Sequence, residues 1–154
     1  MDALGNLEGI EVRSMRTADI EVVLEIEAET FSSPWQHETF SALLDRPGVE
    51  LLVLEDAAEG VIGYAVLWCV LDQGELANVA VAQGRRGRGL GRHLIARVLD
   101  VARDRGVTKM YLEVRSSNDR AAELYRRFGF TEVGLRRDYY DAPREDARIM
   151  MATL

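Results

Sequence analysis

The sequence predicts a single-domain α/β (α+β) protein over residues 1–154, with a mixed central sheet of about seven strands flanked by about four helices. Two observations support this prediction. A chain of 154 residues suits one domain with one hydrophobic core. Segments with apolar residues at helical spacing alternate with continuous apolar runs, which gives the element order βααβββαβαββ.

The first 48 residues predict one strand followed by two helices. Residues 8–15 have the pattern of a strand, and Thr17 is expected to cap the helix after it. The Ser-Ser-Pro stretch at 32–34 ends that helix, a second helix spans 36–44, and Arg-Pro-Gly at 46–48 forms a turn. The apolar face of the first helix consists of Ile20, Val23, Leu24, Ala28 and Phe31.

Three strands and a long helix follow. The strands are expected over residues 49–54, 61–71 and 75–81, and an acidic turn ending at Gly60 separates the first two. The helix is amphipathic and closes at Gly106. Its apolar face consists of Leu90, Leu94, Ile95, Val98, Leu99 and Ala102.

The C-terminal part predicts a strand, a helix and two further strands. The first strand spans residues 109–115. Asn118 is expected to cap the next helix, which stops at Gly129. The last two strands cover 130–135 and 147–154. The apolar stripe of the helix consists of Ala121, Leu124, Tyr125 and Phe128.

Composition limits the class of protein. The 47% apolar content is ordinary for a globular domain. No apolar stretch approaches the roughly 18 residues that a membrane span requires, and the first 15 residues lack the features of a signal peptide. Cys69 is the only cysteine, so no internal disulfide can form, and its apolar surroundings predict an inert thiol. We therefore expect a cytoplasmic protein that is not bound to membranes.

Charge is divided unevenly along the chain. Residues 1–84 hold 16 Asp and Glu against 3 Arg, whereas residues 85–154 hold 10 acidic against 16 basic residues. This division suggests a cationic partner for the first part and an anionic one for the second. The alternative is a chance segregation of ordinary surface charge.

A cluster of arginine and glycine, "VAVAQGRRGRGLGRHLI", connects the predicted strand over 75–81 to the long helix. Because a helix N-terminus carries unpaired N–H groups and glycine removes the Cβ, the cluster predicts a phosphate-binding turn. The motif Arg86-x-x-Gly89-x-Gly91 is neither a P-loop nor GxGxxG. Nucleic-acid binding is the rival interpretation, but the acidic composition and the lack of interleaved aromatics argue against it.

This motif resembles the acyl-CoA pyrophosphate loop of the GCN5-related N-acetyltransferases (GNAT). The resemblance continues through "FSSPW", "YLEVRSSNDRAAELYRRFGF" and "RRDYYDAPREDARIMM", and over nearly the whole chain it is similar to the ribosomal-protein-alanine, or RimI-type, branch. It implies a GNAT-like fold and acetyl-CoA as the acetyl donor. The cofactor-binding residues that it implies are Val79, Ala80, Val81, Arg86, Gly87, Arg88, Gly89, Leu90, Gly91 and Asn118.

The resemblance also implies two catalytic residues. Glu113 would be the general base, in a strand where Glu is otherwise disfavoured, and Tyr125 would protonate the leaving thiolate. From the residues alone, Glu113 could equally be an exposed strand residue paired with Arg115, and Tyr125 a core tyrosine. Asn118 could be only a helix cap, and residues 79–81 an ordinary core strand.

The acceptor is expected to be a protein N-terminus, because an α-amine of pKa about 7.7 to 8.0 is neutral far more often than a lysine. The acidic first part of the chain favours a basic ribosomal protein. The resemblance implies that Phe31, Trp35, Tyr139 and Tyr140 build the peptide groove. Alternatives are a small amine, a lysine side chain, or a non-catalytic acyl-CoA sensor. We expect no metal site, because two separated His and one Cys do not supply a set of metal ligands. We expect the protein to be a monomer or a weak dimer.

Overall fold

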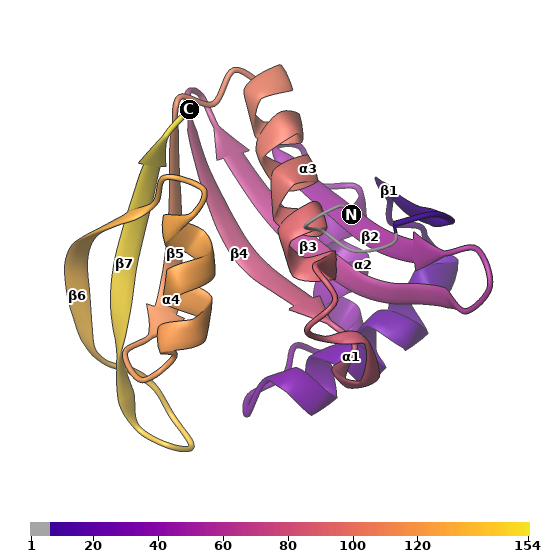
Figure 1. The fold of residues 1–154 in the computed structure, drawn as a ribbon, viewed down its shortest axis with the longest axis horizontal. Helices are drawn as coiled ribbons and strands as arrows, with labels where there is room; N and C mark the ends of the chain where they lie inside the picture. Colours follow the sequence, from indigo (N-terminus) through magenta and orange to yellow (C-terminus); the bar gives the residue numbers. More distant parts are fainter. Residues whose placement is uncertain (1–6) are drawn as a thin grey trace.

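One seven-stranded sheet in the order β1-β2-β3-β4-β5-β7-β6 forms the centre of the computed structural model, which describes residues 7–154 (Figure 1). Neighbouring strands are antiparallel except β4 and β5, which are parallel. The strands are β1 (Ile10–Ser14), β2 (Val49–Asp56), β3 (Gly60–Val70), β4 (Gln73–Val81), β5 (Lys109–Arg115), β6 (Thr131–Tyr140) and β7 (Glu145–Thr153).

Helices cover the sheet on both faces. They are α1 (Ile20–Thr30), α2 (His37–Leu44), α3 (Leu90–Asp104) and α4 (Asp119–Arg126), with 3₁₀ turns η1 (Thr17–Asp19) and η2 (Gln83–Arg85). Because side chains alternate across a strand, Leu52 and Leu54 of β2 pack towards α3, and Leu51 and Val53 towards α1 and α2. The predicted α/β class and the order of helices and strands are confirmed, with the two 3₁₀ turns added.

The two helices on the α1 side cover only part of the sheet. Their core cluster includes buried residues of β2, β3 and β4, but none of β5, β6 or β7. On β5, by contrast, Met110, Leu112 and Val114 are buried in the cluster on the α3 side. The alternate residues Tyr111 and Glu113 therefore belong to the part of that sheet face that α1 and α2 leave uncovered.

Two predicted boundaries depart most from the structure, and several other strand ends differ by one or two residues. Thr17 does not cap α1, whose N-cap is Asp19. Thr17 begins η1, whose N-cap is Arg16, and the backbone N–H of Arg16 donates a 2.8 Å hydrogen bond to the carboxylate of Asp19. The strand predicted to end at residue 135 extends to Tyr140, because it pairs with β7 as far as Glu145. Its side chains are mostly exposed, so the sequence lacks the apolar pattern of a strand there.

The cap at Asn118 is confirmed. Its side-chain oxygen accepts a 3.1 Å hydrogen bond from the N–H of Ala121, at the start of α4. This bond satisfies one of the unpaired donors in the first turn and fixes where α4 leaves the strand before it.

An ion pair at the start of α1 makes stability depend on pH. Arg13 donates to both carboxylate oxygens of Asp19, at 2.8 and 2.9 Å, and these bonds hold the pKa of Asp19 below its ordinary value. A lowered folded pKa stabilises the protein above the unfolded pKa, and this contribution is lost on acidification. We expect the gap in unfolding free energy between the wild type and Asp19→Asn to shrink from pH 7 to about pH 3. Urea titrations across that range measure it, and a gap independent of pH would contradict the assignment.

Candidate active site

The parallel strands β4 and β5 separate part of the way along their length. They pair from Gln73 with Lys109 to Leu76 with Leu112, and beyond that point each continues with no pairing to the other. The register of β4 against β3 shifts between Leu76 and Asn78, which is the signature of a β-bulge. Figure 1 shows the two strands diverging from there. The edge of β4 that faces β5 is thus open to a ligand.

The predicted residues Val79, Ala80 and Val81 all lie on this open part of β4. On their other side they pair with Ala65, Tyr64 and Gly63 of β3, so one edge is fixed while the other has no strand beside it. The carbonyl of Val81 also accepts a 2.9 Å hydrogen bond from the Nε of Arg86. The segment therefore offers backbone groups to an extended ligand, as a neighbouring strand would.

The turn between η2 and α3 carries the predicted phosphate-binding residues. Gly87 and Gly89 have φ values of +81° and +77°, which L-residues with a side chain rarely adopt, and Gly89 is the N-cap of α3. Within the described chain, the N–H groups of residues 87–92 donate to no backbone carbonyl. Six neighbouring donors at the positive end of a fifteen-residue helix form a favourable place for a phosphate.

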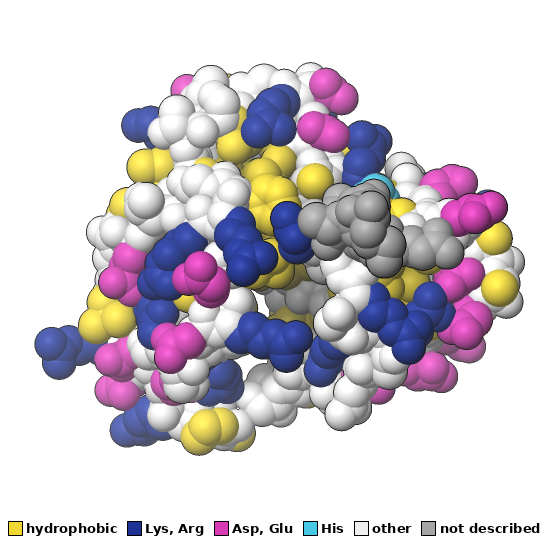
Figure 2. Space-filling model, in the orientation of Figure 1, with side chains coloured by type: hydrophobic (Ala, Val, Ile, Leu, Met, Phe, Trp, Pro, Cys, Tyr) yellow, Lys and Arg dark blue, Asp and Glu magenta, His cyan; other side chains and the backbone are white. Residues whose placement is uncertain are grey.

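The arginines of this turn differ in their roles. The side chain of Arg86 forms hydrogen bonds within the protein: besides its bond to the Val81 carbonyl, its Nη2 donates to the hydroxyl of Thr30 at 2.9 Å. Arg85 pairs with Asp56 at 2.6 Å and with Glu59. Arg88 is exposed, and Arg120 of α4 reaches across to Gly87, with Nη2 3.9 Å from where a Cβ would stand. In Figure 2, Lys and Arg side chains gather around a hollow in the face that carries α3 and α4.

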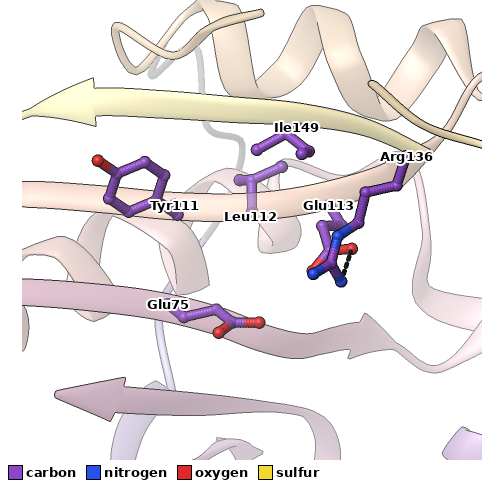
Figure 3. A pocket seen from close by; sticks show the side chains of 6 residues that line it. All are labelled: Glu75, Tyr111, Leu112, Glu113, Arg136 and Ile149. Carbon is purple, nitrogen blue, oxygen red and sulfur yellow. Dashed lines mark hydrogen bonds and ion pairs between the residues drawn. The ribbon is translucent and has the colours of Figure 1, made fainter. Parts of the chain in front are cut away.

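Glu113 lies on the uncovered face of β5, just past its last pairing with β4. Its side chain is 19% exposed and forms a 3.4 Å ion pair with Arg136, not with Arg115, so that alternative was wrong. The two line a pocket of about 150 Å³ (Figure 3). Burial and the neighbouring Glu113 raise the pKa of Glu75 in the same pocket. The lining residues are Glu75, Tyr111, Leu112, Glu113, Arg136 and Ile149.

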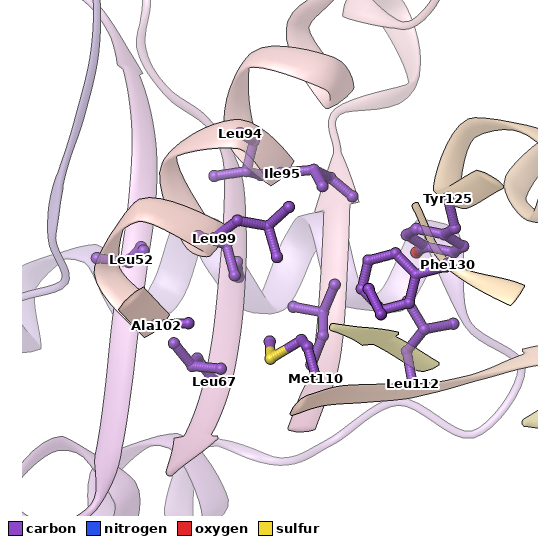
Figure 4. Packing of buried hydrophobic residues seen from close by; sticks show 14 of the residues in the cluster. Leu52, Leu67, Leu94, Ile95, Leu99, Ala102, Met110, Leu112, Tyr125 and Phe130 are labelled. Atoms are coloured by element: carbon purple, nitrogen blue, oxygen red, sulfur yellow. The ribbon is translucent and has the colours of Figure 1, made fainter. Parts of the chain in front are cut away.

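Tyr125 lies on the opposite face, in the core between α4 and the sheet. It is 9% exposed, and its ring meets that of Phe130 edge-on at 5.9 Å between centroids (Figure 4). Burial, and to a lesser degree Tyr140, raises the pKa of its hydroxyl above the ordinary value. The phenol is therefore protonated at neutral pH and can act as a proton donor.

Tyr139 and Tyr140 meet at the end of β6, with ring centroids 5.0 Å apart. Burial, followed by the charge of Glu113, raises the pKa of Tyr140 to about 12, and both causes in the same order raise that of Tyr139. The charge of Glu113 thus acts on the pKa of both tyrosines. Arg136 stacks on Tyr139 at 5.3 Å, which adds a second contact to this side of the pocket.

Phe31 and Trp35 come from the segment between α1 and α2. Both are partly buried and pack against the core under these helices, and the Trp35 ring lies 5.5 Å from that of Phe40. The segment nevertheless meets the hairpin that carries the tyrosines, because Arg115 donates to Ser32 at 3.1 Å and to the carbonyl of Asp141 at 3.0 Å. The structure thus brings the α1–α2 segment and the β6–β7 hairpin together at one rim.

Several residues of this region were not predicted from the sequence. They are Glu27, Tyr64, Glu75, Asn78, Arg120 and Arg136. One signal was present: Glu27 is seven residues after Ile20, so it occupies a position on the apolar face of α1. A carboxylate at a core position indicates either a paired charge or a functional group.

Other kinds of site are not found in the part of the chain that the structure describes. No helix among residues 7–154 is long and apolar enough to cross a membrane. Nor do these residues bring together three His, Cys, Asp or Glu side chains that could hold a metal ion. Cys69 is half-buried at the end of β3 that pairs with Gly74, and burial raises the pKa of its thiol.

Comparisons with known proteins agree with this geometry. The acetyltransferase (GNAT) family matches residues 20–130. The [ribosomal protein bS18]-alanine N-acetyltransferase of Escherichia coli K12 is 36% identical over 142 residues, which are 90% of this chain and 94% of that protein. The crystal structure of the Escherichia coli ribosomal-protein-S18-alanine N-acetyltransferase, 34% identical, superposes with a TM-score of 0.86 over 94% of this chain and 93% of the other. A spermidine N-acetyltransferase from Vibrio cholerae, 22% identical, has the same fold, with a TM-score of 0.82 over 95% and 94% of the two chains. This protein belongs to the acetyltransferase (GNAT) family.

Proposed function

We propose that this protein transfers the acetyl group of acetyl-CoA to the α-amine of a protein N-terminus, by direct transfer in a ternary complex. The observation that carries the proposal is the position of Glu113 and Tyr125. The carboxylate and the protonated phenol come from opposite faces of the sheet: Glu113 directly follows the last β4–β5 pair, and Tyr125 belongs to the core cluster that includes that pair, Leu76 and Leu112. A base and an acid on either side of an open strand edge suit acyl transfer.

Acetyl-CoA fits the open edge and the turn after it. The pantetheine arm has amide groups that can pair with the backbone of Val79, Ala80 and Val81, as a strand would. The pyrophosphate would accept hydrogen bonds from the N–H groups of residues 87–92, with charge from Arg88 and Arg120. Because the Asn118 side chain caps α4, it would act on the donor by fixing the start of that helix.

The reaction needs no covalent enzyme intermediate. The neutral amine attacks the thioester carbonyl carbon, Glu113 accepts the proton that the nitrogen loses, and the C–S bond breaks. Tyr125 gives its proton to the departing sulfur, which leaves as a thiol. The Arg136 contact to Glu113 is a single 3.4 Å bond from a side chain that is 56% exposed, so an incoming amine can displace it at small cost.

A ribosomal protein is the proposed acceptor. The relative in Escherichia coli is named a [ribosomal protein bS18]-alanine N-acetyltransferase and spans nearly the same length as this chain. The acidic residues of the pocket, Glu75 and Glu113, suit a basic N-terminus. An α-amine also requires less help from a base than a lysine does, because its pKa is lower by about 2.5.

The test is acetyl-CoA turnover with an N-terminal bS18 peptide of the source organism, read as released thiol. Mass spectrometry locates the added group, and the same peptide with a blocked α-amine is the matched control. Transfer to the free peptide alone supports the proposal. Transfer to a lysine of the blocked peptide, or to spermidine in preference to both peptides, would replace the proposed acceptor. Acetyl-CoA binding without any transfer would favour a sensor.

A further inference from the structure

A carboxylate lies in the core beneath the proposed acceptor site. Glu27, in α1, is 1% exposed and accepts three hydrogen bonds. Its Oε1 accepts one hydrogen bond from the hydroxyl of Tyr64 and another, of 2.8 Å, from the side-chain amide of Asn78. Its Oε2 accepts a 2.9 Å hydrogen bond from the backbone N–H of Trp35. The two oxygens thus have different partners. Oε1 binds side chains of the sheet, and Oε2 binds the backbone of the segment between α1 and α2.

The partners of Glu27 are all neutral. Among the described residues no Lys, Arg or His forms an ion pair with it. Burying a carboxylate is costly, and replacing such a group with an apolar residue of similar volume often leaves a protein as stable or more so. Core packing therefore does not account for a carboxylate at this position of α1. Its geometry, which links three separate elements, gives a more specific reason.

The elements that Glu27 links belong to the proposed binding sites of the acetyl donor and of the acceptor peptide. Asn78 follows the bulge of β4, where the strand turns away from β5 and its edge opens. Trp35 belongs to the segment whose Ser32 is held by Arg115, the residue that also holds the β6–β7 hairpin. One carboxylate thus connects the strand that would hold the donor to the segment that would border the acceptor.

We propose that Glu27 is a positioning residue for the acceptor peptide: it fixes the segment over residues 31–36 against β4, at the height where the open edge begins. This inference rests on the proposed function, because it concerns the same acceptor. Glu27 is too deeply buried to touch the peptide itself. Its effect is transmitted through the backbone of Trp35, which a carboxylate can hold and an amide nitrogen cannot.

The test is Glu27→Gln. The glutamine oxygen can still accept from Tyr64 and Asn78, but its NH₂ group meets the N–H of Trp35 as donor against donor. We expect KM for the bS18 peptide to rise about tenfold, in line with an unsatisfied buried hydrogen bond, while kcat and the Kd of acetyl-CoA stay within about twofold. Compared with the wild type, Glu27→Gln should show faster amide hydrogen exchange in residues 31–36 and unchanged exchange in β2.

The matched control is Val23→Ala, on the same helix. Val23 is fully buried and leaves a cavity when truncated, so the variant lowers Tm while it keeps all three hydrogen bonds of Glu27. An unchanged KM in Glu27→Gln, or an equal rise in Val23→Ala, overturns the inference. If Glu27→Gln does not fold, Tyr64→Phe takes its place, with an expected KM rise of about threefold from the loss of one bond to Oε1. An unchanged KM in Tyr64→Phe likewise overturns it.

The experiment separates this inference from the proposed function. If wild-type protein does not acetylate the peptide, the proposed function fails. Faster hydrogen exchange over residues 31–36 in Glu27→Gln still tests the contact, because that measurement needs no substrate. If the wild type turns over and Glu27→Gln matches it in KM, only the inference about Glu27 fails.

Discussion

Glu113→Gln is expected to lower kcat/KM for the peptide by about 100-fold at pH 7, within the range that general bases contribute. Glutamine keeps the size of the side chain but cannot accept the proton of the attacking amine. The pair with Arg136 is partly exposed, so its loss should change stability little. Steady-state rates across pH 6 to 9, with the Kd of acetyl-CoA measured in parallel, test this.

The pH profile distinguishes the role of a base from a role in binding. The deficit of the variant should be largest at low pH, where the amine is mostly protonated, and smaller above about pH 8, the ordinary pKa of an α-amine. Glu123→Gln, on the exposed side of α4, is the control and should behave as the wild type. Near-full activity of Glu113→Gln at both pH 7 and pH 8.5 would show that another group accepts the proton.

Gly89→Asp is expected to abolish acetyl-CoA binding, raising the Kd at least about 100-fold. The φ of +77° at Gly89 suits glycine, and an aspartate there adds a side chain and a negative charge at the free N–H groups of the turn. Both changes act against a pyrophosphate. Isothermal titration calorimetry with acetyl-CoA measures the loss, and circular dichroism shows whether the variant is folded.

A second glycine supplies the control for backbone strain. Gly106, after α3, has a φ of +83° and open space where a Cβ would stand, but it lies at the other end of the helix. Gly106→Asp carries the same charge and the same strain, so it should lose similar stability and still bind acetyl-CoA. An equal Kd of acetyl-CoA for the wild type and Gly89→Asp would show that the pyrophosphate does not bind at this turn.

The sequence was most informative where a regular pattern is bounded by clear end signals. The strand over residues 109–115 was predicted to the residue, because its alternating apolar side chains all face one core. The cap at Asn118 was equally clear, since a short polar side chain directly before an apolar helical stripe has few other purposes.

The geometry of the site was less predictable. The bulge at β4 leaves no mark in "ELANVAV", because its extra residue, Ala77, is recognised only from the way β4 pairs with β3. The partners of Glu113 and Glu27 come from residues 23 and up to 51 positions away, so no local pattern indicates them. The roles of Glu113 and Tyr125 in catalysis stay predictions, although Glu113 directly follows the last pair of the diverging strands.

The short contact between β4 and β5 also has a consequence for folding. Only four residue pairs join these strands, so the sheet consists of two parts, β1–β4 and β5–β7, with a weak seam between them. A donor bound along the free edge of β4 would act as a temporary strand that completes the seam. Binding to the folded state alone adds about 2.7 kcal/mol of stability at a concentration of 100 Kd. The supply of acetyl-CoA would then set how long this protein survives proteolysis, as well as how fast it works.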